Sequence, residues 1–243
     1  MLRDVPGSVL DSTDERVIEF RPGWPGAGPN GVRRVSCSAE RLPSLIDEVR
    51  DLGHRHGTGL DWRLDEWNQA ELAPVLLAKG LKLDAEVTIM ELLSEVEEPP
   101  VPGLELADGM ADVDAFRTHH ATVAAGFRDV DRPVPEGDLR TRYNSVRVPG
   151  QFLVTAFVFG EPAGGGGLSV EHDGASLSGG SVLPKFRHRG VYRALVAERA
   201  RLAHEAGAPF LITNARPASR PILEFMGFRP IGRWWGYKEP PTR

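Results

Sequence analysis

The chain contains a single cysteine, Cys37, among its 243 residues. One cysteine cannot form an internal disulfide, and no zinc-ligand spacing accompanies it, so we expect a reducing compartment and no metal site. His54 and His56 lie close together, but no third ligand follows nearby. The sequence also lacks a signal-peptide pattern and any apolar run approaching about 20 residues. We therefore expect a cytoplasmic protein with no membrane partner.

The chain has no excess of basic over acidic residues. Lys and Arg number 29 against 34 Asp and Glu, which gives a formal net charge of −5 at pH 7. Nucleic-acid-binding domains present a basic face, so this balance argues against a nucleic-acid partner. Hydrophobic residues make up 41% and charged residues 26%, as in ordinary globular proteins, and the length fits one large domain or two small ones.

The most informative stretch runs from Ala175 to Phe228. An extended run at Ser176–Leu183 ends at a proline and is followed by a basic turn, and then by an amphipathic helix that Gly207 terminates. In the turn, Gly190 can adopt backbone conformations that L-residues avoid, and it lets an anion approach the main chain closely. Free N–H groups at a helix start, beside arginines, bind anions. The stretch therefore predicts a pyrophosphate site.

The pattern Arg187-x-x-Gly190, after a Val-Leu-Pro strand end, resembles the acyl-CoA-binding signature of the GNAT superfamily of N-acetyltransferases. The segment Ser219–Phe228 is similar to the family's next segment, a helix that ends in Gly-Phe. Two positions depart from the pattern. Tyr192 stands where a second Gly or Ala is usual, and Leu223 stands where many members carry the tyrosine that protonates the departing thiolate.

The resemblance implies that acetyl-CoA binds as a co-substrate and that an amine attacks its thioester directly. An N–H near Val182 and Leu183 is expected to hold the thioester carbonyl, and the same stretch to pair with the pantetheine arm. Asn214 and Ser219 would bond the pantetheine from the other side, or would instead cap the helix that starts near Pro221. The pyrophosphate is expected to contact main-chain N–H groups of Arg187, His188, Arg189, Gly190, Val191, Tyr192 and Arg193.

The sequence assigns no catalytic base. Family members often place a Glu in the strand before the cofactor turn, but this strand reads Ser178-Gly179-Gly180-Ser181. A histidine on an apolar helix face is more often part of the core, and a Glu next to a turn is more often plain surface. The loop that carries Arg128, Asp129 and Asp131 is expected to be solvated. Weak candidates for the acceptor side are His119, His120, Tyr143 and Glu171.

Residues 104–243 show the order of elements that a GNAT fold requires. Strands are expected at 104–106, 152–159, 166–171, 175–183 and 209–213, with helices at about 110–127, 136–146, 191–206 and 221–226. The run Gly164–Gly167 has no following Lys-Ser/Thr, so it is not a P-loop, and we expect a strained strand start or a bulge.

The first half repeats part of this order without the basic turn. Strands are expected at 16–20, 32–36, 60–64 and 84–93, with helices at about 45–53 and 71–79, and the loop 21–31 between the first two strands is rich in Pro and Gly. Leu76-x-x-x-Gly80-Leu81 matches Leu223-x-x-x-Gly227-Phe228. We interpret residues 1–98 as a degenerate GNAT-like unit with a structural role, 99–103 as a linker and 104–243 as the GNAT domain. An unrelated α/β lobe is the alternative for the first half.

The predicted fold class is α/β, with a mixed, mostly antiparallel sheet flanked by helices. The predicted function is transfer of an acetyl group from acetyl-CoA to an amine of a small molecule or peptide. The alternative is a sensor or assembly module that binds acyl-CoA without efficient catalysis, because both usual acid–base positions are empty. A nucleotide-binding domain is disfavoured, since neither a Rossmann fingerprint nor a Walker motif is present.

Overall fold

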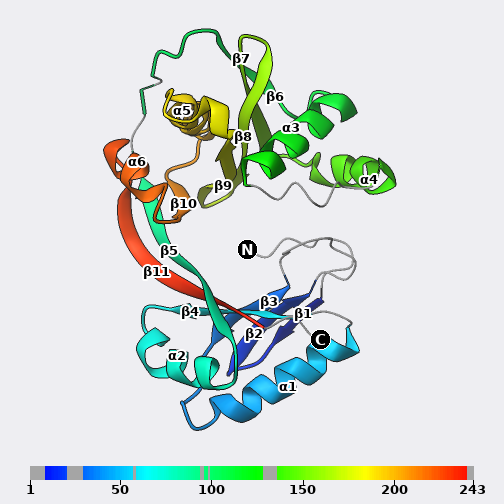
Figure 1. Ribbon diagram of the computed structural model, residues 1–243, viewed down its shortest axis with the longest axis vertical. Coiled ribbons are helices and arrows are strands. Elements are labelled where there is room, and N and C mark those ends of the chain that lie inside the picture. Colours follow the sequence, from blue (N-terminus) through cyan, green and yellow to red (C-terminus); the bar gives the residue numbers. More distant parts are fainter. Residues whose placement is uncertain are drawn as a thin grey trace. The chain divides into compact units, whose positions relative to one another are not determined.

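The computed structural model describes residues 9–20, 30–56, 59–93, 96–97, 99–127 and 136–239, of which residues 136–138 are described by their backbone alone. These residues form six α-helices and eleven strands (Figure 1). The helices are α1 (Leu42–Arg55), α2 (Gln69–Ala78), α3 (Val113–Gly126), α4 (Glu136–Val146), α5 (Val191–Glu205) and α6 (Arg220–Phe225). The strands are β1 (Val9–Ser12), β2 (Arg16–Phe20), β3 (Gly31–Val35), β4 (Asp61–Asp65), β5 (Lys82–Leu92), β6 (Leu104–Asp108), β7 (Gln151–Val158), β8 (Glu161–Glu171), β9 (Gly174–Val182), β10 (Leu211–Ala215) and β11 (Arg229–Lys238).

The described chain divides into two compact units. Unit 1 comprises the described residues up to Thr88 together with those from Gly232 onward, and unit 2 comprises those from Ile89 to Ile231. The predicted boundaries, 1–98 and 104–243 with a linker at 99–103, rest on a repeat in the sequence. Compact units are a different criterion, so these boundaries stay a prediction. Among the described residues, no helix combines the length and the apolar character needed to cross a membrane.

Unit 1 has the strand order β1-β2-β3-β4-β11-β5, in which β3 and β4 are parallel. Helix α1 places apolar residues on one face, because they recur at intervals of three and four; they are Leu42, Leu45, Ile46 and Val49. This face packs with Trp62 and Leu64 of β4 in the core of the unit. The helix continues through Gly53, where its end was predicted, to Arg55.

The boundary between the units falls within β5, so this strand contributes residues to both. Unit 2 has the strand order β5-β10-β9-β8-β7-β6. In it β9 and β10 are parallel, and β6 to β9 are antiparallel neighbours. Helices α3 and α5 lie on opposite sides of β8 (Figure 1). A Cβ atom at Gly165 would lie 3.0 Å from His119 of α3, whereas one at Gly166 would lie 2.4 Å from Arg199 of α5. Neighbouring residues of a strand face opposite sides, so the two helices cover the two faces.

The glycine run Gly164–Gly167 lies inside β8, which begins at Glu161 and not at Gly166 as predicted. A bulge does occur opposite the glycine run, but its extra residue belongs to β9 and not to the run itself. Between Gly165 and Gly167 the register against β9 shifts, so that Gly166 alone faces both Gly179 and Gly180. Two further differences are that β1 was not predicted and that β10 extends beyond the predicted strand end.

Candidate functional site

The parallel strands β9 and β10 pair over three residues and then separate. Ala175–Leu177 pair with Leu211–Thr213, and the pairing stops there although β9 continues to Val182. The edge of β9 after Leu177, which we call the open edge, is therefore unpaired with β10, and Ser178 and Gly179 are exposed there. An unpaired strand edge can accept an extended ligand as an added strand.

Val182 directs its main-chain groups toward this open edge. The N–H of Leu183 donates to the carbonyl oxygen of Ala163 (2.8 Å), so Val182 and Gly164 face each other without mutual hydrogen bonds. The N–H and C=O of Val182 consequently point away from β8, and the carbonyl oxygen accepts a hydrogen bond from Nε of Arg187 (3.1 Å). Of the two predicted donors to a thioester carbonyl, Leu183 already uses its N–H, whereas that of Val182 faces the open edge.

The turn before α5 contains two residues in the left-handed region, His188 with φ 59° and Gly190 with φ 86°. Successive N–H groups in such a turn converge and form a concavity that binds anions. Gly190 is the N-cap of α5 without a side-chain cap, and the first helical hydrogen bond runs from the N–H of Ala194 to its carbonyl oxygen (3.0 Å). The N–H groups of the three residues before Ala194 thus lack an acceptor within the helix, as a bound phosphate would require.

The arginines of the turn have different surroundings. Nη2 of Arg187 donates to the carbonyl oxygen of Gly126 at the end of α3 (3.0 Å), so this side chain fastens the turn to α3 and β9. Arg189 is exposed, with its guanidinium 5.8 Å from the centre of the Phe186 ring. Arg193 lies over the exposed ring of Phe225 at 5.1 Å. Main-chain N–H groups and Arg189 are therefore the features of the turn best suited to phosphate.

Tyr192 reaches from the first turn of α5 to the start of α6. A Cβ atom at Gly180 would lie 3.3 Å from the tyrosine ring, so the ring lies beside β9 at its bulge. The hydroxyl group hydrogen-bonds Ser219, and burial raises the pKa of Tyr192, which keeps it protonated at neutral pH. Leu223, at the position of the family's tyrosine, is 1% exposed and belongs to the core.

The two predicted pantetheine contacts, Ser219 and Asn214, lie at the start of α6 and in β10. Ser219 is the N-cap residue of α6, but its hydroxyl donates to the carbonyl oxygen of Arg216 (3.2 Å) and makes no cap hydrogen bond. Asn214 lies within β10 and is exposed. Ser219 therefore occupies the predicted cap position without a capping side-chain bond, and the predicted pantetheine contacts of Ser219 and Asn214 stay a prediction.

Three of the four acceptor-side candidates lie near one another: His120 and Tyr143 contact Phe116 of α3, and His119 lies beside His120. The His120 and Tyr143 rings lie 4.3 and 5.5 Å from the Phe116 ring, and the two histidine rings are 5.6 Å apart. His119 is 3% exposed, and its Nδ1 lies 3.0 Å from Oγ1 of Thr155.

Burial is the largest cause that lowers the pKa of both histidines, to about 3 for His119 and about 4 for His120, so both are neutral at pH 7. Tyr143 donates its hydroxyl proton to the carbonyl oxygen of Met110 (3.3 Å). Within the part of the chain that the structure describes, Nε2 of His120 has no hydrogen-bond partner. Glu171 is exposed at the far end of β8 and does not join this group. The predicted charged loop at 128–131 lies outside the described residues.

Arg199 is the polar residue near the open edge that the sequence analysis missed. It is 1% exposed, and its guanidinium donates to main-chain carbonyl oxygens of Leu195 (2.7 Å), Gly167 (3.1 Å) and Ser178 (3.3 Å). One signal was present: Arg199 follows Leu195 by four residues on the apolar face of the predicted helix, opposite a strand of four glycines.

Unit 1 contains a second pair of parallel strands that separate. Strands β3 and β4 pair only at Gly31–Val32 and Asp61–Trp62. Beyond that point Asn68 joins them, because its side chain donates to the carbonyl oxygen of Val35 (2.9 Å) and accepts from the N–H of Asp65 (3.1 Å). An open cleft of about 570 Å³ lies at these strand ends. Two backbone groups that an added strand could use, the Val35 carbonyl and the Asp65 N–H, are thus already bonded to Asn68.

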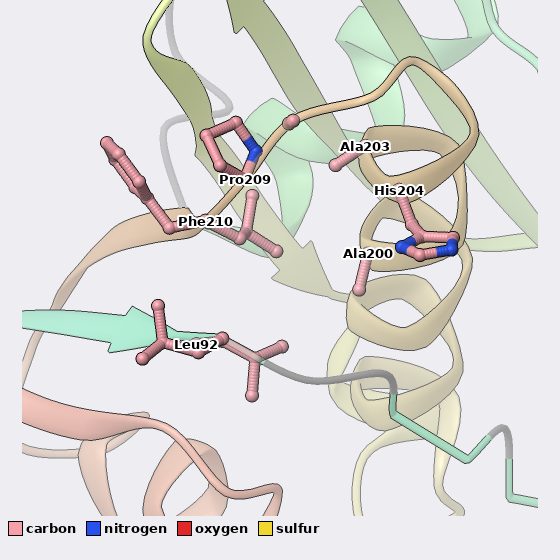
Figure 2. A pocket seen from close by; sticks show the side chains of 9 residues that line it. Leu92, Ala200, Ala203, His204, Pro209 and Phe210 are labelled. Carbon is pink, nitrogen blue, oxygen red and sulfur yellow. The ribbon is translucent and has the colours of Figure 1, made fainter.

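A small pocket of about 210 Å³ lies at the C-terminal end of α5, away from the turn. Figure 2 shows His204, Ala200 and Ala203 of α5 on one side and Leu92, Pro209 and Phe210 on the other. Apolar residue types predominate in its lining, and none of the lining residues belongs to the open edge. Among the described residues, no group of three or more His, Cys, Asp or Glu side chains could hold a metal ion.

Comparisons with known proteins identify the fold. No model of a protein family matches the sequence, and no curated protein matches it. Among solved structures, a GCN5-related N-acetyltransferase from Kribbella flavida matches with a TM-score of 0.71 and 14% identity, over 97% of this chain and 91% of that one. A conserved protein of unknown function from Staphylococcus epidermidis matches with a TM-score of 0.69 and 14% identity, over 98% and 95%. A tandem GNAT protein from the clavulanic acid biosynthesis pathway matches with a TM-score of 0.61 and 18% identity, over 98% and 85%.

These matches confirm the predicted fold class. The chain has the α/β fold of the GNAT N-acetyltransferases, with a mixed, mostly antiparallel sheet and helices around it, and its structural neighbours over nearly the full length include a tandem GNAT protein. At identities of 14–18% the likeness concerns the fold alone.

Proposed function

We propose that this protein is an N-acetyltransferase that transfers an acetyl group from acetyl-CoA to an amine within a ternary complex. The observation that carries the proposal is the combination of the open edge of β9 with the turn at His188–Gly190, which leads directly into the uncapped start of α5. The edge suits the extended pantetheine arm, and the turn suits the pyrophosphate that follows it in the same molecule.

In the reaction, the amine nitrogen forms a bond to the acetyl carbon, the carbon–sulfur bond breaks, and the amine loses a proton. The Val182 N–H faces the open edge and is the proposed donor to the carbonyl oxygen as negative charge develops there. The departing thiolate belongs to an acid of pKa about 8.5, judged from cysteine, so it leaves without strong assistance and the loss of the family's tyrosine at Leu223 is tolerable.

Deprotonation of the amine is the more demanding step. A lysine-like ammonium of pKa about 10.4 costs roughly 4.6 kcal/mol to deprotonate at pH 7. His120 is neutral and has an unbonded Nε2 among the described residues, but a pKa of about 4 makes it a weak base. No residue is therefore proposed as the catalytic base. His119, His120 and Tyr143 are proposed only to line the acceptor side.

A second candidate function is binding of acyl-CoA without turnover, as a sensor or assembly module. Two observations favour it: the open edge at Ser178–Ser181 carries no carboxylate, and Leu223 is buried in the core. Acceptor-dependent release of the CoA thiol separates the two functions, because only the enzyme would produce it.

The experiment that tests the proposal begins with a thermal-shift titration using acetyl-CoA, with CoA and NAD as comparisons. A ligand at 100 times its dissociation constant adds about 2.7 kcal/mol, and each kcal/mol raises Tm by roughly 2–4 °C at this size. A shift with acetyl-CoA and none with NAD, followed by thiol release with a panel of amines, is the expected result. No shift with any CoA species would remove the basis of the proposal.

A further inference from the structure

Arg199 lies inside unit 2, between α5 and the sheet. It is 1% exposed, and burial lowers its pKa only to about 10, so the buried guanidinium carries its charge at neutral pH. Among the described residues, no carboxylate forms an ion pair with it, and the titratable groups that interact with its charge are Tyr192 and His119. An unpaired buried charge is costly to a fold unless hydrogen bonds compensate for it.

The fold provides space for this side chain at two glycines. A Cβ atom at Gly166 would lie 2.4 Å from Nη1 of Arg199, and one at Gly180 would lie 3.3 Å from Nη2. Any larger residue at Gly166 would displace the guanidinium. The central part of the glycine run in β8, together with Gly180 in β9, therefore accommodates an arginine.

The guanidinium holds the bulge of β9. Nη1 donates to the carbonyl oxygens of Gly167 and Ser178, which face each other on β8 and β9 where the register shifts. The bulge follows at once, where Gly179, with φ 60°, and Gly180 face the single Gly166. A bulge leaves one residue without its ladder hydrogen bonds. This residue lies just beyond Leu177, where β9 and β10 separate.

We propose that Arg199 is a positioning residue for the acyl group of the bound thioester: it fixes the bulge at Gly179 and Gly180, and its buried charge makes that part of the open edge favourable for the thioester carbonyl oxygen. This inference rests on the proposed function and deepens it. Arg199 itself does not touch the acyl group. It acts by holding the Ser178 carbonyl toward α5, so that the peptide groups that follow, up to the Val182 N–H proposed as the donor to the carbonyl oxygen, keep one orientation, while the turn binds the pyrophosphate.

The test compares two ligands that differ at the carbonyl. Acetyl-CoA and S-ethyl-CoA share the nucleotide, the pantetheine arm and a two-carbon group, but the thioether S-ethyl-CoA has no carbonyl oxygen. Their dissociation constants are measured by calorimetry for the wild type, Arg199→Lys, Arg199→Met and the control Arg201→Met. Arg201 lies on the same helix, is exposed, and pairs with Glu198 and Glu205, so its loss removes a charge without touching the sheet.

The wild type is expected to prefer acetyl-CoA to S-ethyl-CoA by about tenfold, the effect of one good hydrogen bond to a polarised oxygen. Both Arg199 variants are expected to lose most of that preference while their affinity for S-ethyl-CoA stays within about threefold, with Arg199→Lys less affected than Arg199→Met. A purely structural role would weaken both ligands equally, and that result would overturn the inference.

Three further outcomes are decisive without the methionine variant, should it fail to fold. Equal affinity of the wild type for acetyl-CoA and S-ethyl-CoA would overturn the role given to Arg199 and leave the proposed function intact. Failure of the wild type to bind any CoA species would instead overturn the proposed function. The same preference in Arg199→Lys as in the wild type would again remove the role assigned to Arg199 alone.

Discussion

The guanidinium group of Arg187 donates a hydrogen bond to the carbonyl oxygen of Gly126, 3.0 Å away at the C-terminal end of α3. Together with the bond to Val182, this contact joins three segments that are distant in sequence: the end of α3, the end of β9 and the turn before α5. The signature arginine is thus bonded to the protein's own backbone, and the exposed Arg189 is the cation of the turn that is free to face solvent.

We therefore expect Arg187→Ala and Arg189→Ala to have different effects. Arg187→Ala removes two charge-assisted hydrogen bonds from a partly buried site and should lower the free energy of unfolding by about 2 kcal/mol. Arg189→Ala should leave stability within about 0.5 kcal/mol but weaken acetyl-CoA binding, most clearly at low salt. Urea unfolding and titrations at two salt concentrations check this. If Arg189→Ala were the more destabilising change, the assignment of the two side chains would be wrong.

Gly190 gives a second prediction, for the change Gly190→Asp. Its φ is 86°, and a Cβ atom there would lie 3.0 Å from Cγ2 of Val101, so an aspartate brings strain, crowding and a negative charge to the turn. Acetyl-CoA binding should be lost. Gly207→Asp is the matched control, because Gly207 has φ 78° at the other end of α5 with nothing within 4 Å. That variant should bear similar strain and bind normally; retained affinity in Gly190→Asp would rule out the turn as the pyrophosphate site.

Local signals predicted much of the fold. The apolar spacing along α1, the glycines Gly80 and Gly207 after helices, and the turn at Gly190 each act within a few residues, so the sequence contains all that determines them. The boundaries of β8 were less accessible. Four consecutive glycines carry no side-chain alternation, so the period of two that marks a strand was absent from Gly164–Gly167.

The parts of the site that were missed depend on contacts between distant segments. Arg199 is buried because Gly166 of β8 and Gly180 of β9 leave room for it. In the sequence of a helix, a single arginine normally indicates a face exposed to solvent. The engaged N–H of Leu183 depends on pairing with Ala163, and Asn68 acts on two strands whose separation only the fold establishes. Such contacts join distant segments, so no pattern within a single segment of the sequence predicts them.

Asn68 gives a third prediction. Asn68→Ala leaves the carbonyl oxygen of Val35 and the N–H of Asp65 without their bonded partner and should lower the free energy of unfolding by about 1–3 kcal/mol. Asn68→Asp can still accept from Asp65 but cannot donate to Val35, so it should also destabilise unit 1. Neither change touches the open edge of β9 or the turn, so acetyl-CoA affinity should stay within about twofold. A large loss of affinity in a folded variant would show that unit 1 takes part in binding.

The fourth prediction concerns how the free energy of unfolding changes at acidic pH. Burial lowers the pKa of His119 to about 3, against an ordinary value of 6.5 in the unfolded chain. Below pH 6.5 the unfolded chain binds a proton that the folded protein does not, so the contribution to stability is complete above pH 6.5. It is lost as pH falls toward about 3, by up to about 1.4 kcal/mol per pH unit.

His119→Gln should flatten this dependence, because its amide can keep the contact with Thr155 Oγ1 but cannot titrate. Urea unfolding of the wild type and of His119→Gln between pH 6.5 and about 4 measures the two slopes. The control is His172→Gln, which makes the same substitution at a fully exposed histidine. His120, with a pKa lowered to about 4, contributes in the same direction, so part of the slope should remain in His119→Gln. Identical slopes in His119→Gln and the wild type would mean that His119 takes up its proton in the folded state, and the buried, neutral histidine described here would then be the wrong assignment.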